Sequence, residues 1–395
     1  MTIPGTRSDA LDRIPHDEMV ATRRFLHAHP ELSMVEHDTA ALVAMELSAL
    51  GLDEIRTGIG KTGVLGTLVG GRPGPVTLLR ADMDALPIVQ LNDVPYASEK
   101  AGVMHACGHD GHVAILLAAA KTLAARRAEV PGTLVFCFQP GEEGYAGNRL
   151  MIQDGALEQP HVDRSFALHL YSQLDVGKIG IRDGAFFASA DEFELIIKGK
   201  GGHGAMPQMS VDPIVAGAHL VTMLQTIVSR EVAPKDPAVI TVGQFVGGTT
   251  FNVIPDQVKL LGTVRSFDPD VRASMPQRMQ RIIDGLAHSM RIEAEFTYHW
   301  SYPPTVNNLA LAEVVRAVGR EVLGAENVVG EHDIVMWAED MSFMMEQRPG
   351  AYFIVGARGG PPTGVPHHNA RFDIDERALD VGYTMMVALG LRGDA

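Results

Sequence analysis

Between about residues 187 and 301 the chain carries six predicted elements in the order strand, helix, strand, strand, helix, strand. They are the strand DEFELIIKGK, a helix from Asp212 to Ser229, the strands AVITVGQFVG and QVKLLGTVRSF, a helix over residues 270–290 and the strand RIEAEFTYHW. This order is that of a ferredoxin-like α+β domain. The segment also has the length of a small domain, so we expect an inserted domain at residues 187–301.

Helix and strand alternate on both sides of this segment. Before it we predict a helix in DTAALVAMELSALG, the strands GVLGTLVGG and PVTLLRADMD, a helix over about residues 110–127, the strand GTLVFCFQP, a helix near residues 147–155 and the strand RSFALHL. The alternation resumes with a helix around residues 308–323. The predicted fold class is α/β: a discontinuous domain, residues 1–186 and 302–395, with a central mostly parallel sheet flanked by helices.

Composition restricts the possible partners and locations. The 395 residues are 46% hydrophobic and 21% charged, which is typical of a globular chain with two domains. The net charge of −15 and the absence of runs of Lys and Arg argue against nucleic acid as a partner. Two cysteines, no long uncharged apolar stretch and an N-terminus without a signal-peptide core lead us to expect reduced thiols, no membrane partner and a cytoplasmic location.

The stretch HACGHDGH, residues 105–112, concentrates three histidines, a cysteine and an aspartate. Cys107 and His109 would point about 200° apart on a helix, so they can share a metal ion only in the loop before the helix. Gly108 permits such a loop, at the side of an α/β sheet where ligands bind. Histidines that only cap the helix and fill the loop are the alternative.

An acidic pair, Glu142 and Glu143, follows a predicted strand in the glycine-rich loop FQPGEEGYAG. Such a pair is often a solvated turn. Beside a metal centre, one carboxylate can bind a divalent ion while its neighbour handles the proton of an attacking water. This division of roles is what metal-assisted hydrolysis requires.

Further candidate ligands lie where other strands should end. Together they make five donors, too many for one tetrahedral ion and suitable for two: Cys107, His109, Glu143, His169 and His368. Such a set accepts Zn²⁺, Mn²⁺, Co²⁺ or Ni²⁺. Asp82 and Asp84 follow the strand in LLRADMDALP and are candidates to orient the ligands.

Eight short motifs, in chain order, resemble a known family. They are HPELSMVEHDT, RADMDALPI, MHACGHDGH, QPGEEGYAGNRLM, GKGGHGAMP, FNVIPD, GTVRSFD and HHNARFDID. From about Phe25 onwards the chain is similar to the binuclear metallopeptidase family that contains hippurate hydrolase, auxin-conjugate hydrolases and related carboxypeptidases. The resemblance implies a catalytic domain that holds two divalent ions per subunit on the five ligands above, with Glu142 as acid and base.

The resemblance also implies that the inserted domain is a dimerisation, or lid, domain, so we expect a homodimer or a dimer-based tetramer. It assigns His203 to the active site of the partner subunit, where it stabilises the oxyanion, and it assigns Asn252 and Arg265 to the carboxylate of the substrate. These residue types suit the roles. Arg offers two parallel donors to a carboxylate, and a donor such as His203 acts where negative charge develops on the oxyanion.

The implied reaction is metal-dependent hydrolysis of N-acyl or N-aroyl amino acids, as in hippurate hydrolase, to a carboxylic acid and a free amino acid. A metallo-carboxypeptidase or dipeptidase of the same family is the alternative. Two positions depart from the family. Ala370 stands where a proline is common, which would loosen the loop that carries His368. The motif AED, Ala338 to Asp340, stands where SED is common, which bears on the substrate pocket.

Three other interpretations stay open. GKGGHG has the GxGxxG spacing of a dinucleotide-binding oxidoreductase, although no acidic residue ends a strand about 20 residues on. Cys107 with His109 would be the nucleophile and base of a cysteine hydrolase. A non-catalytic metal-binding protein would keep the ligands, but it has no use for Glu142 beside Glu143.

Overall fold

The structure is a computed structural model that describes residues 14–393. These residues divide into two compact units. Unit 1 comprises residues 14–184, 306–333 and 340–393, and unit 2 comprises residues 185–305 and 334–339. Within residues 14–393, every helix is too short or too polar to cross a membrane. Residues 1–13, which enter the expectation about a signal peptide, lie outside the described part.

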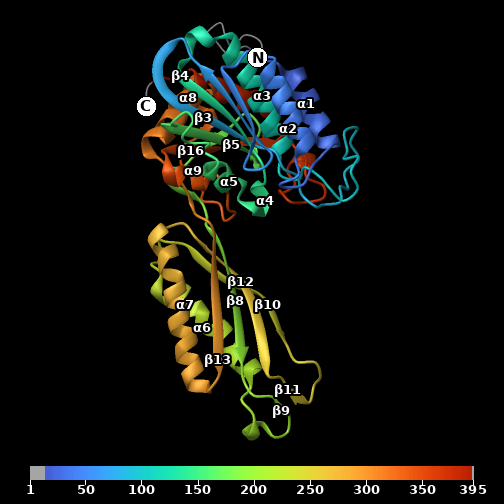
Figure 1. The fold of residues 1–395 in the computed structure, drawn as a ribbon, viewed down its shortest axis with the longest axis vertical. Helices are drawn as coiled ribbons and strands as arrows, with labels where there is room; N and C mark the ends of the chain where they lie inside the picture. The colour runs from blue at the N-terminus through green and yellow to red at the C-terminus, as the bar shows by residue number, and fades with distance from the viewer. Residues whose placement is uncertain (1–13, 394–395) are drawn as a thin grey trace. The chain divides into compact units, whose positions relative to one another are not determined.

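Unit 1 is built on an eight-stranded sheet with the order β1-β2-β4-β3-β5-β16-β6-β15 (Figure 1). Its strands are β1 (Glu54–Ile59), β2 (Gly63–Val69), β3 (Arg72–Asp82), β4 (Pro131–Gln139), β5 (Arg164–Asp175), β6 (Ile179–Gly180), β15 (Val328–Val329) and β16 (Gly350–Arg358). Its helices are α1 (His16–Ala28), α2 (His37–Ser48), α3 (His109–Ala125), α4 (Glu142–Tyr145), α5 (Gly147–Gln153), α8 (Leu309–Leu323), α9 (Ser342–Gln347) and α10 (Arg377–Gly390).

The centre of this sheet is parallel. Strand β3 pairs in parallel with β4 and β5, and β5 pairs in parallel with β16, whereas β1 and β2 are antiparallel. The predicted mostly parallel sheet is therefore confirmed. Because the carboxyl ends of parallel strands meet at one edge, the end of β3 at Asp82 lies beside the end of β4 at Gln139.

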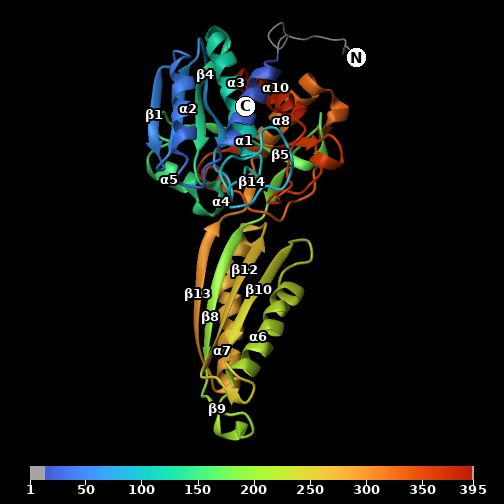
Figure 2. The same ribbon diagram turned by 90° about the vertical axis from the view of Figure 1, so that its right-hand side faces the viewer.

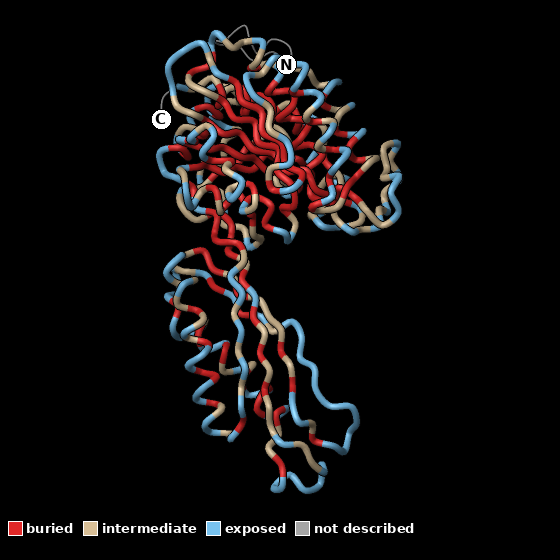
Figure 3. Tube along the Cα trace, viewed as in Figure 1, coloured by how far each residue is buried: buried red, intermediate tan, exposed pale blue. Residues whose placement is uncertain are grey.

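Helices cover both faces of the sheet, as the alternation of side chains along β4 demonstrates. Leu134 and Phe136 belong to the main core, and Leu134 faces Leu123 of α3. Cys137, on the opposite face, contacts Met151 of α5. Helices α1 and α10 pack on α3 (Figure 2), and the strands between the helical layers are buried along most of their length (Figure 3).

Unit 2 has the predicted order of elements, and its α+β fold is confirmed. Its four-stranded sheet has the order β10-β12-β8-β13 and packs against two helices with its own core. The elements are β8 (Ala190–Lys198), α6 (Pro213–Thr226), β10 (Ala238–Gly247), β12 (Gln257–Ser266), α7 (Pro269–Met290) and β13 (Glu293–Tyr302). Asp212 and Asp268 cap the two helices by accepting backbone N–H groups, and a proline opens each.

Unit 2 also contains a two-stranded ribbon that the sequence did not predict. It pairs β9 (Gly202–His203) with β11 (Val253–Ile254) and lies at one end of the four-stranded sheet (Figure 1). Two further short strands are β7 (Gly184–Phe187) and β14 (Thr305–Asn307), in the segments where the chain passes between the units.

Candidate metal centre

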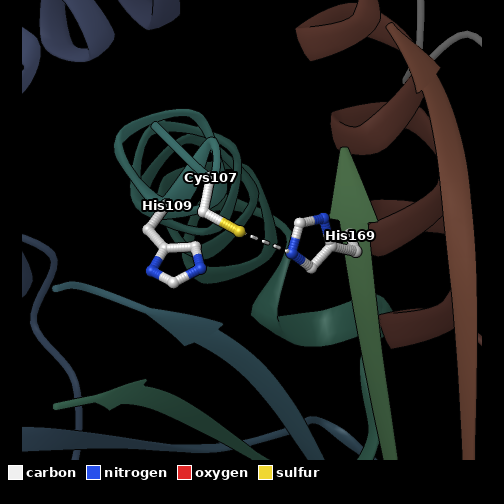
Figure 4. Close-up of side chains that lie close together, drawn as sticks. All are labelled: Cys107, His109 and His169. Atoms are coloured by element: carbon white, nitrogen blue, oxygen red, sulfur yellow. Dashed lines mark hydrogen bonds between the residues drawn. The ribbon is translucent and has the colours of Figure 1, made fainter. Parts of the chain in front are cut away.

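The loop before α3 brings a thiol and an imidazole together at the carboxyl edge of the sheet. Gly108 has φ +98°, a left-handed conformation that favours glycine, and α3 begins directly after it at His109. The turn lets Cys107 and His109 converge with His169 of β5, and their ligand atoms lie within 4.8 Å of one another (Figure 4). The Cys107 Sγ atom is 3.4 Å from His169 Nε2.

Both imidazoles are held through their Nδ1 atoms. His109 Nδ1 lies 2.9 Å from the backbone oxygen of Asp84, and His169 Nδ1 lies 2.8 Å from that of Leu170. A carbonyl can only accept, so each Nδ1 carries the proton and donates it. In the neutral ring, Nε2 then keeps the lone pair, which is how metal-binding histidines are usually oriented.

A second group shares the same thiol. Cys107, Glu143 and His368 place three ligand atoms within 4.8 Å, and so do His109, Glu142 and Glu143. His368 Nε2 lies 3.0 Å from Glu143 Oε1, and the His368 side chain is half exposed. The structure therefore brings all five predicted ligands and Glu142 into one cluster within unit 1.

The other two histidines of HACGHDGH lie outside these groups of donors. His112 Nδ1 donates to Asp82, 2.5 Å away, and its Nε2 accepts the N–H of Leu170 at 2.9 Å. Both nitrogens of His112 are thereby used, which leaves no lone pair for an ion. His105 is buried, and its ring nitrogens form no hydrogen bond with a described residue.

The loop that carries the glutamates depends on left-handed glycines. Gly141 has φ +58° and Gly144 has φ +86°, on either side of Glu142 and Glu143. A Cβ atom on Gly141 would approach Met34 Sδ to 2.3 Å, so the position requires glycine for space as well as for conformation. The loop turns sharply after β4 and presents both carboxylates at the edge of the sheet.

Asp82 and Asp84 lie beside the five ligands, and Asp82 also forms a candidate group with His109 and His112, whose ring nitrogens are both hydrogen-bonded. Asp84 accepts the Glu143 backbone N–H at 2.9 Å and also positions His109 through its own backbone oxygen. Asp82 Oδ2 accepts a hydrogen bond from Arg80 at 2.7 Å. These contacts support the predicted orienting role.

A buried polar network behind Glu142 was missed by sequence reasoning. Asp340 is fully buried and accepts hydrogen bonds from Gln139 Nε2 at 2.6 Å, Arg80 Nη2 at 3.1 Å and the Asn148 backbone at 3.0 Å. Its own N–H faces Glu142 Oε1 at 3.4 Å. Arg80 lies in the motif RADMDALPI, Gln139 and Asn148 lie in QPGEEGYAGNRLM and Asp340 lies in AED, but nothing in the sequence indicated that these residues meet.

The electrostatics of the cluster argue against a cysteine nucleophile. Burial, and then the charges of Glu143 and Glu142, raise the pKa of the Cys107 thiol well above its ordinary value. A reactive cysteine needs electropositive surroundings that lower its pKa. The acidic surroundings of Cys107 instead favour a cation.

The two imidazoles have opposite environments. Burial lowers the pKa of His169 well below its ordinary value, and His112 and His367 lower it further, so its ring is neutral. Burial also opposes the charged form of His109, but Asp82, Asp84 and Glu143 outweigh it and raise the pKa to about 10. A cation bound at Nε2 would take the place of that proton among the same carboxylates.

The donors fit divalent metal ions. Glu143 Oε1 and His109 Nε2 are buried and form no hydrogen bond with any residue in the described part. Each lies near an oppositely charged group, His368 Nε2 at 3.0 Å and Asp82 Oδ2 at 3.5 Å, but a buried polar atom without a hydrogen bond is costly, and a coordinated ion would satisfy both atoms. A thiol, imidazoles and carboxylates are together the donor types that zinc and its neighbours in the first transition series prefer.

The loop bearing His368 is well anchored despite Ala370. His368 adopts a left-handed conformation with φ +60°, and its N–H donates to the Ala106 oxygen at 2.8 Å. The Ala370 oxygen accepts the Leu91 N–H at 2.7 Å. These bonds restrain the loop where the proline is missing.

The remaining predicted residues belong to unit 2. His203 is exposed on β9, and its Nδ1 accepts the Ala205 N–H at 3.0 Å, so in the neutral ring Nε2 carries the proton and can donate it. Asn252 is exposed beside β11, and its backbone oxygen accepts the Gly204 N–H at 2.8 Å. Arg265 lies near the other end of β12 and forms no ion pair with a described carboxylate.

Comparison with known proteins identifies a family with this arrangement. The model of peptidase family M20/M25/M40 matches residues 78–392. An N-acyl-L-amino acid amidohydrolase of Geobacillus stearothermophilus is 46% identical over 291 residues, which are 73% of this chain and 78% of that protein. An N-acetylcysteine deacetylase of Bacillus subtilis is 39% identical over 375 residues, 94% of this chain and 95% of that protein.

A solved structure gives the same result. The YXEP protein of Bacillus subtilis, described as a dinuclear metal binding peptidase of the M20 family, superposes with a TM-score of 0.84 at 34% identity and covers 98% of both chains. The fold and the site thus define a metal-dependent amidohydrolase or peptidase that acts on linear amides. The chain belongs to peptidase family M20/M25/M40. The resemblance, the fold class and the enzyme class predicted from the sequence are confirmed.

Proposed function

We propose that this chain hydrolyses the amide bond of N-acyl or N-aroyl amino acids, including hippurate, with two divalent ions per subunit. The observation that carries the proposal is the position of Glu142, a buried carboxylate within 4.8 Å of donors from His109 and Glu143. The substrate class is supported by the related N-acyl-L-amino acid amidohydrolase.

The five ligands divide into two sets that share Cys107. One ion would be held by Cys107, His109 and His169, and the other by Cys107, Glu143 and His368. Zn²⁺, Mn²⁺, Co²⁺ or Ni²⁺ suits these donors. When bound, the ions supply acidity to water and polarise the acyl carbonyl of the substrate.

Glu142 is the acid and base of the proposed reaction. It accepts the proton of the attacking water and delivers it to the nitrogen of the leaving amino acid, so no covalent acyl-enzyme is needed. Its carboxylate is buried, and the Asp340 N–H faces one of its oxygens at 3.4 Å. A group held in this way keeps its orientation through both proton transfers.

The geometry of unit 2 supports a site built from two subunits. His203 and Asn252 are neighbours in the β9–β11 ribbon, whereas Arg265 lies eight residues along β12 from its start at Gln257. Eight residues of strand span about 26 Å, too far for one amino acid carboxylate to touch both Arg265 and Asn252 of a single chain. We propose that His203 and Asn252 act in the site of the partner subunit, while Arg265 acts in its own.

The exposed face of unit 2 supports the homodimer. Strand β10 is an edge of the sheet and carries the exposed apolar residues Phe245 and Val246, and Ile214 and Val215 of α6 are also exposed. Phe245 lies beside α6, because a Cβ atom on Gly217 would approach its ring to 2.7 Å. An open edge next to apolar side chains is a surface for pairing with a second copy.

The family description also favours a second candidate, a metallo-carboxypeptidase or dipeptidase. Both candidate enzymes cleave an amide whose amine side carries a free carboxylate. They differ in the acyl group that they accept on the other side of the amide. We expect the metal-reconstituted protein to bind two divalent ions per chain and to cleave N-acetyl and N-benzoyl amino acids faster than dipeptides with a free amine. A higher kcat/KM for dipeptides would support the second candidate, and two bound ions without any turnover would support a non-catalytic protein.

Arg265→Ala should impair only substrates with a free carboxylate. Burial lowers the pKa of Arg265 but leaves it a cation, and the one described acceptor of its guanidinium is the Ser189 oxygen at 3.4 Å. Loss of a charge-assisted bond should lower kcat/KM for N-benzoylglycine about 10- to 100-fold and leave its methyl ester within about twofold. Lys259→Ala, on the same strand, is the control. Equal losses for acid and ester would make Arg265 structural.

A further inference from the structure

A fully buried arginine on α1 joins two segments of unit 1. Arg23 is 1% exposed, and its guanidinium donates to Asp110 at 2.9 Å, to Asp373 at 2.8 Å and to Glu376 at 3.3 Å. Neither the proposed reaction nor the metal ligands use this residue. A cation with three carboxylate partners is nevertheless costly to bury unless its geometry is fixed.

The carboxylates that Arg23 joins belong to the two segments that carry metal ligands. Asp110 follows His109 in the first turn of α3, and it also contacts His27 at 2.8 Å. Asp373 lies five residues after His368, in the irregular segment that precedes α10. Arg23 is thus a direct link between the start of α3 and the segment of His368.

The segment of His368 has little regular structure of its own, so its position depends on contacts with other segments, of which the Arg23 link is one. No helix or strand covers residues 364–376, apart from turns. Its contacts include those of Ala106 and Leu91 described above, His367 Nε2 at 2.8 Å from the Leu170 oxygen, the buried side chain of Phe372, and Tyr96, whose hydroxyl donates to Asp373 at 2.9 Å. The Tyr96 ring also stacks under the Arg23 guanidinium at 4.7 Å.

We propose that Arg23 is a positioning residue for the metal centre, which fixes the 368–376 segment against α3 so that His368 meets Glu143 and Cys107. The inference rests on the proposed two-ion site. Helix α3 is buried from His109 to Ala120, so we expect it to stay in place without Arg23 and the segment to be the part that moves. The ion on Cys107, Glu143 and His368 therefore depends on Arg23, and the ion on Cys107, His109 and His169 does not.

Arg23→Lys is the test, because a lysine keeps the charge and much of the volume but offers one point donor instead of a planar fork. In the full-length protein we expect affinity for the second Co²⁺ ion to fall about 10- to 100-fold, the usual loss when a residue that orients a ligand is changed. Affinity for the first ion, resolved from the second as a separate step in a titration of Co²⁺ bound per chain, should stay within about twofold.

Two further variants complete the design. Arg24→Lys alters the neighbouring arginine, which is 45% exposed, shares Glu376 with Arg23 and forms no ion pair with Asp110 or Asp373, so it should leave both ions unaffected if the Asp110–Asp373 link positions the segment. Asp373→Asn removes the other end of the link and should weaken the second ion too. The effects of Arg23→Lys and Asp373→Asn should not add, because both break one interaction.

Hydrogen exchange of the metal-free protein tests the link without any ion. Peptides that cover residues 366–376 should exchange faster in Arg23→Lys than in wild type or Arg24→Lys. If the exchange difference is present but the wild-type chain binds fewer than two ions, the proposed two-ion site is overturned and the link by Arg23 is not. Unchanged exchange, or equal weakening of both ions with a lowered Tm, would overturn the positioning role.

Discussion

Glu142→Gln is expected to lower kcat for N-benzoylglycine by about 10²- to 10⁴-fold while the protein keeps its divalent ions. The amide has the shape of the carboxylate and can still accept the Asp340 N–H that faces Glu142 at 3.4 Å. It cannot take a proton from water at neutral pH. Metal content by elemental analysis and kcat at saturating substrate are the two measurements.

The neighbouring glutamate provides the matched control. Glu143→Gln changes the same functional group one position away, but Glu143 Oε1 lies 3.0 Å from His368 and belongs to a ligand set. We expect it to lower metal content, and added metal should restore part of its activity, whereas excess metal should not rescue Glu142→Gln. Reversed phenotypes would show that the roles of the pair are exchanged.

The fold could be predicted from the sequence because its elements follow strong periodic patterns. The strand AVITVGQFVG coincides with β10, and the helix expected at residues 270–290 is α7, Pro269–Met290. The β9–β11 ribbon was missed since each strand has two residues, too few for any periodicity. Strands β6 and β15 were missed for the same reason, and the longer elements α1, β16 and α10 were not predicted either.

The site could be predicted in part, because its donors cluster in two short motifs. HACGHDGH and GEEG each place chemically distinct groups within a few residues, and Gly108 and Gly141 have the left-handed conformations that such turns need. Sequence alone could not decide which histidines of HACGHDGH are ligands. That choice depends on Asp82 and Leu170, which occupy both nitrogens of His112 from distant strands.

The roles of residues that hold other site residues in place could not be predicted from the sequence, for a physical reason. Arg23 and Asp340 act through carboxylates and amides that lie hundreds of positions away, such as Asp373 at a separation of 350 residues and Gln139 at 201. A buried Arg or Asp has no sequence signature that separates it from an exposed one. Only the three-dimensional structure brings together the partners that make their burial tolerable.

The role of His203 across a dimer interface is tested by mixing two inactive variants. His203→Ala removes the proposed donor to the oxyanion, with an expected loss of about 10²- to 10³-fold in kcat, and Glu142→Ala removes the proposed acid and base, so each homodimer lacks one group at both sites. His203 is exposed, and its side chain only accepts the N–H of Ala205, two residues further on, so the change should not disturb folding. Thr249→Ala, at an exposed position in the loop before β11, is the control for the ribbon.

If the site is shared, mixing the two variants should restore a defined fraction of the wild-type activity. In a heterodimer, the site of the His203→Ala subunit keeps its own Glu142 and receives an intact His203 from its partner, whereas the other site lacks both groups. Random reassociation makes about half of the dimers mixed, so activity should recover to roughly a quarter of wild type. Differently tagged chains verify the exchange of subunits. Verified heterodimers that stay as inactive as their parents would mean that His203 serves its own subunit or has no part in hydrolysis, because a group supplied in trans must rescue the site that lacks it.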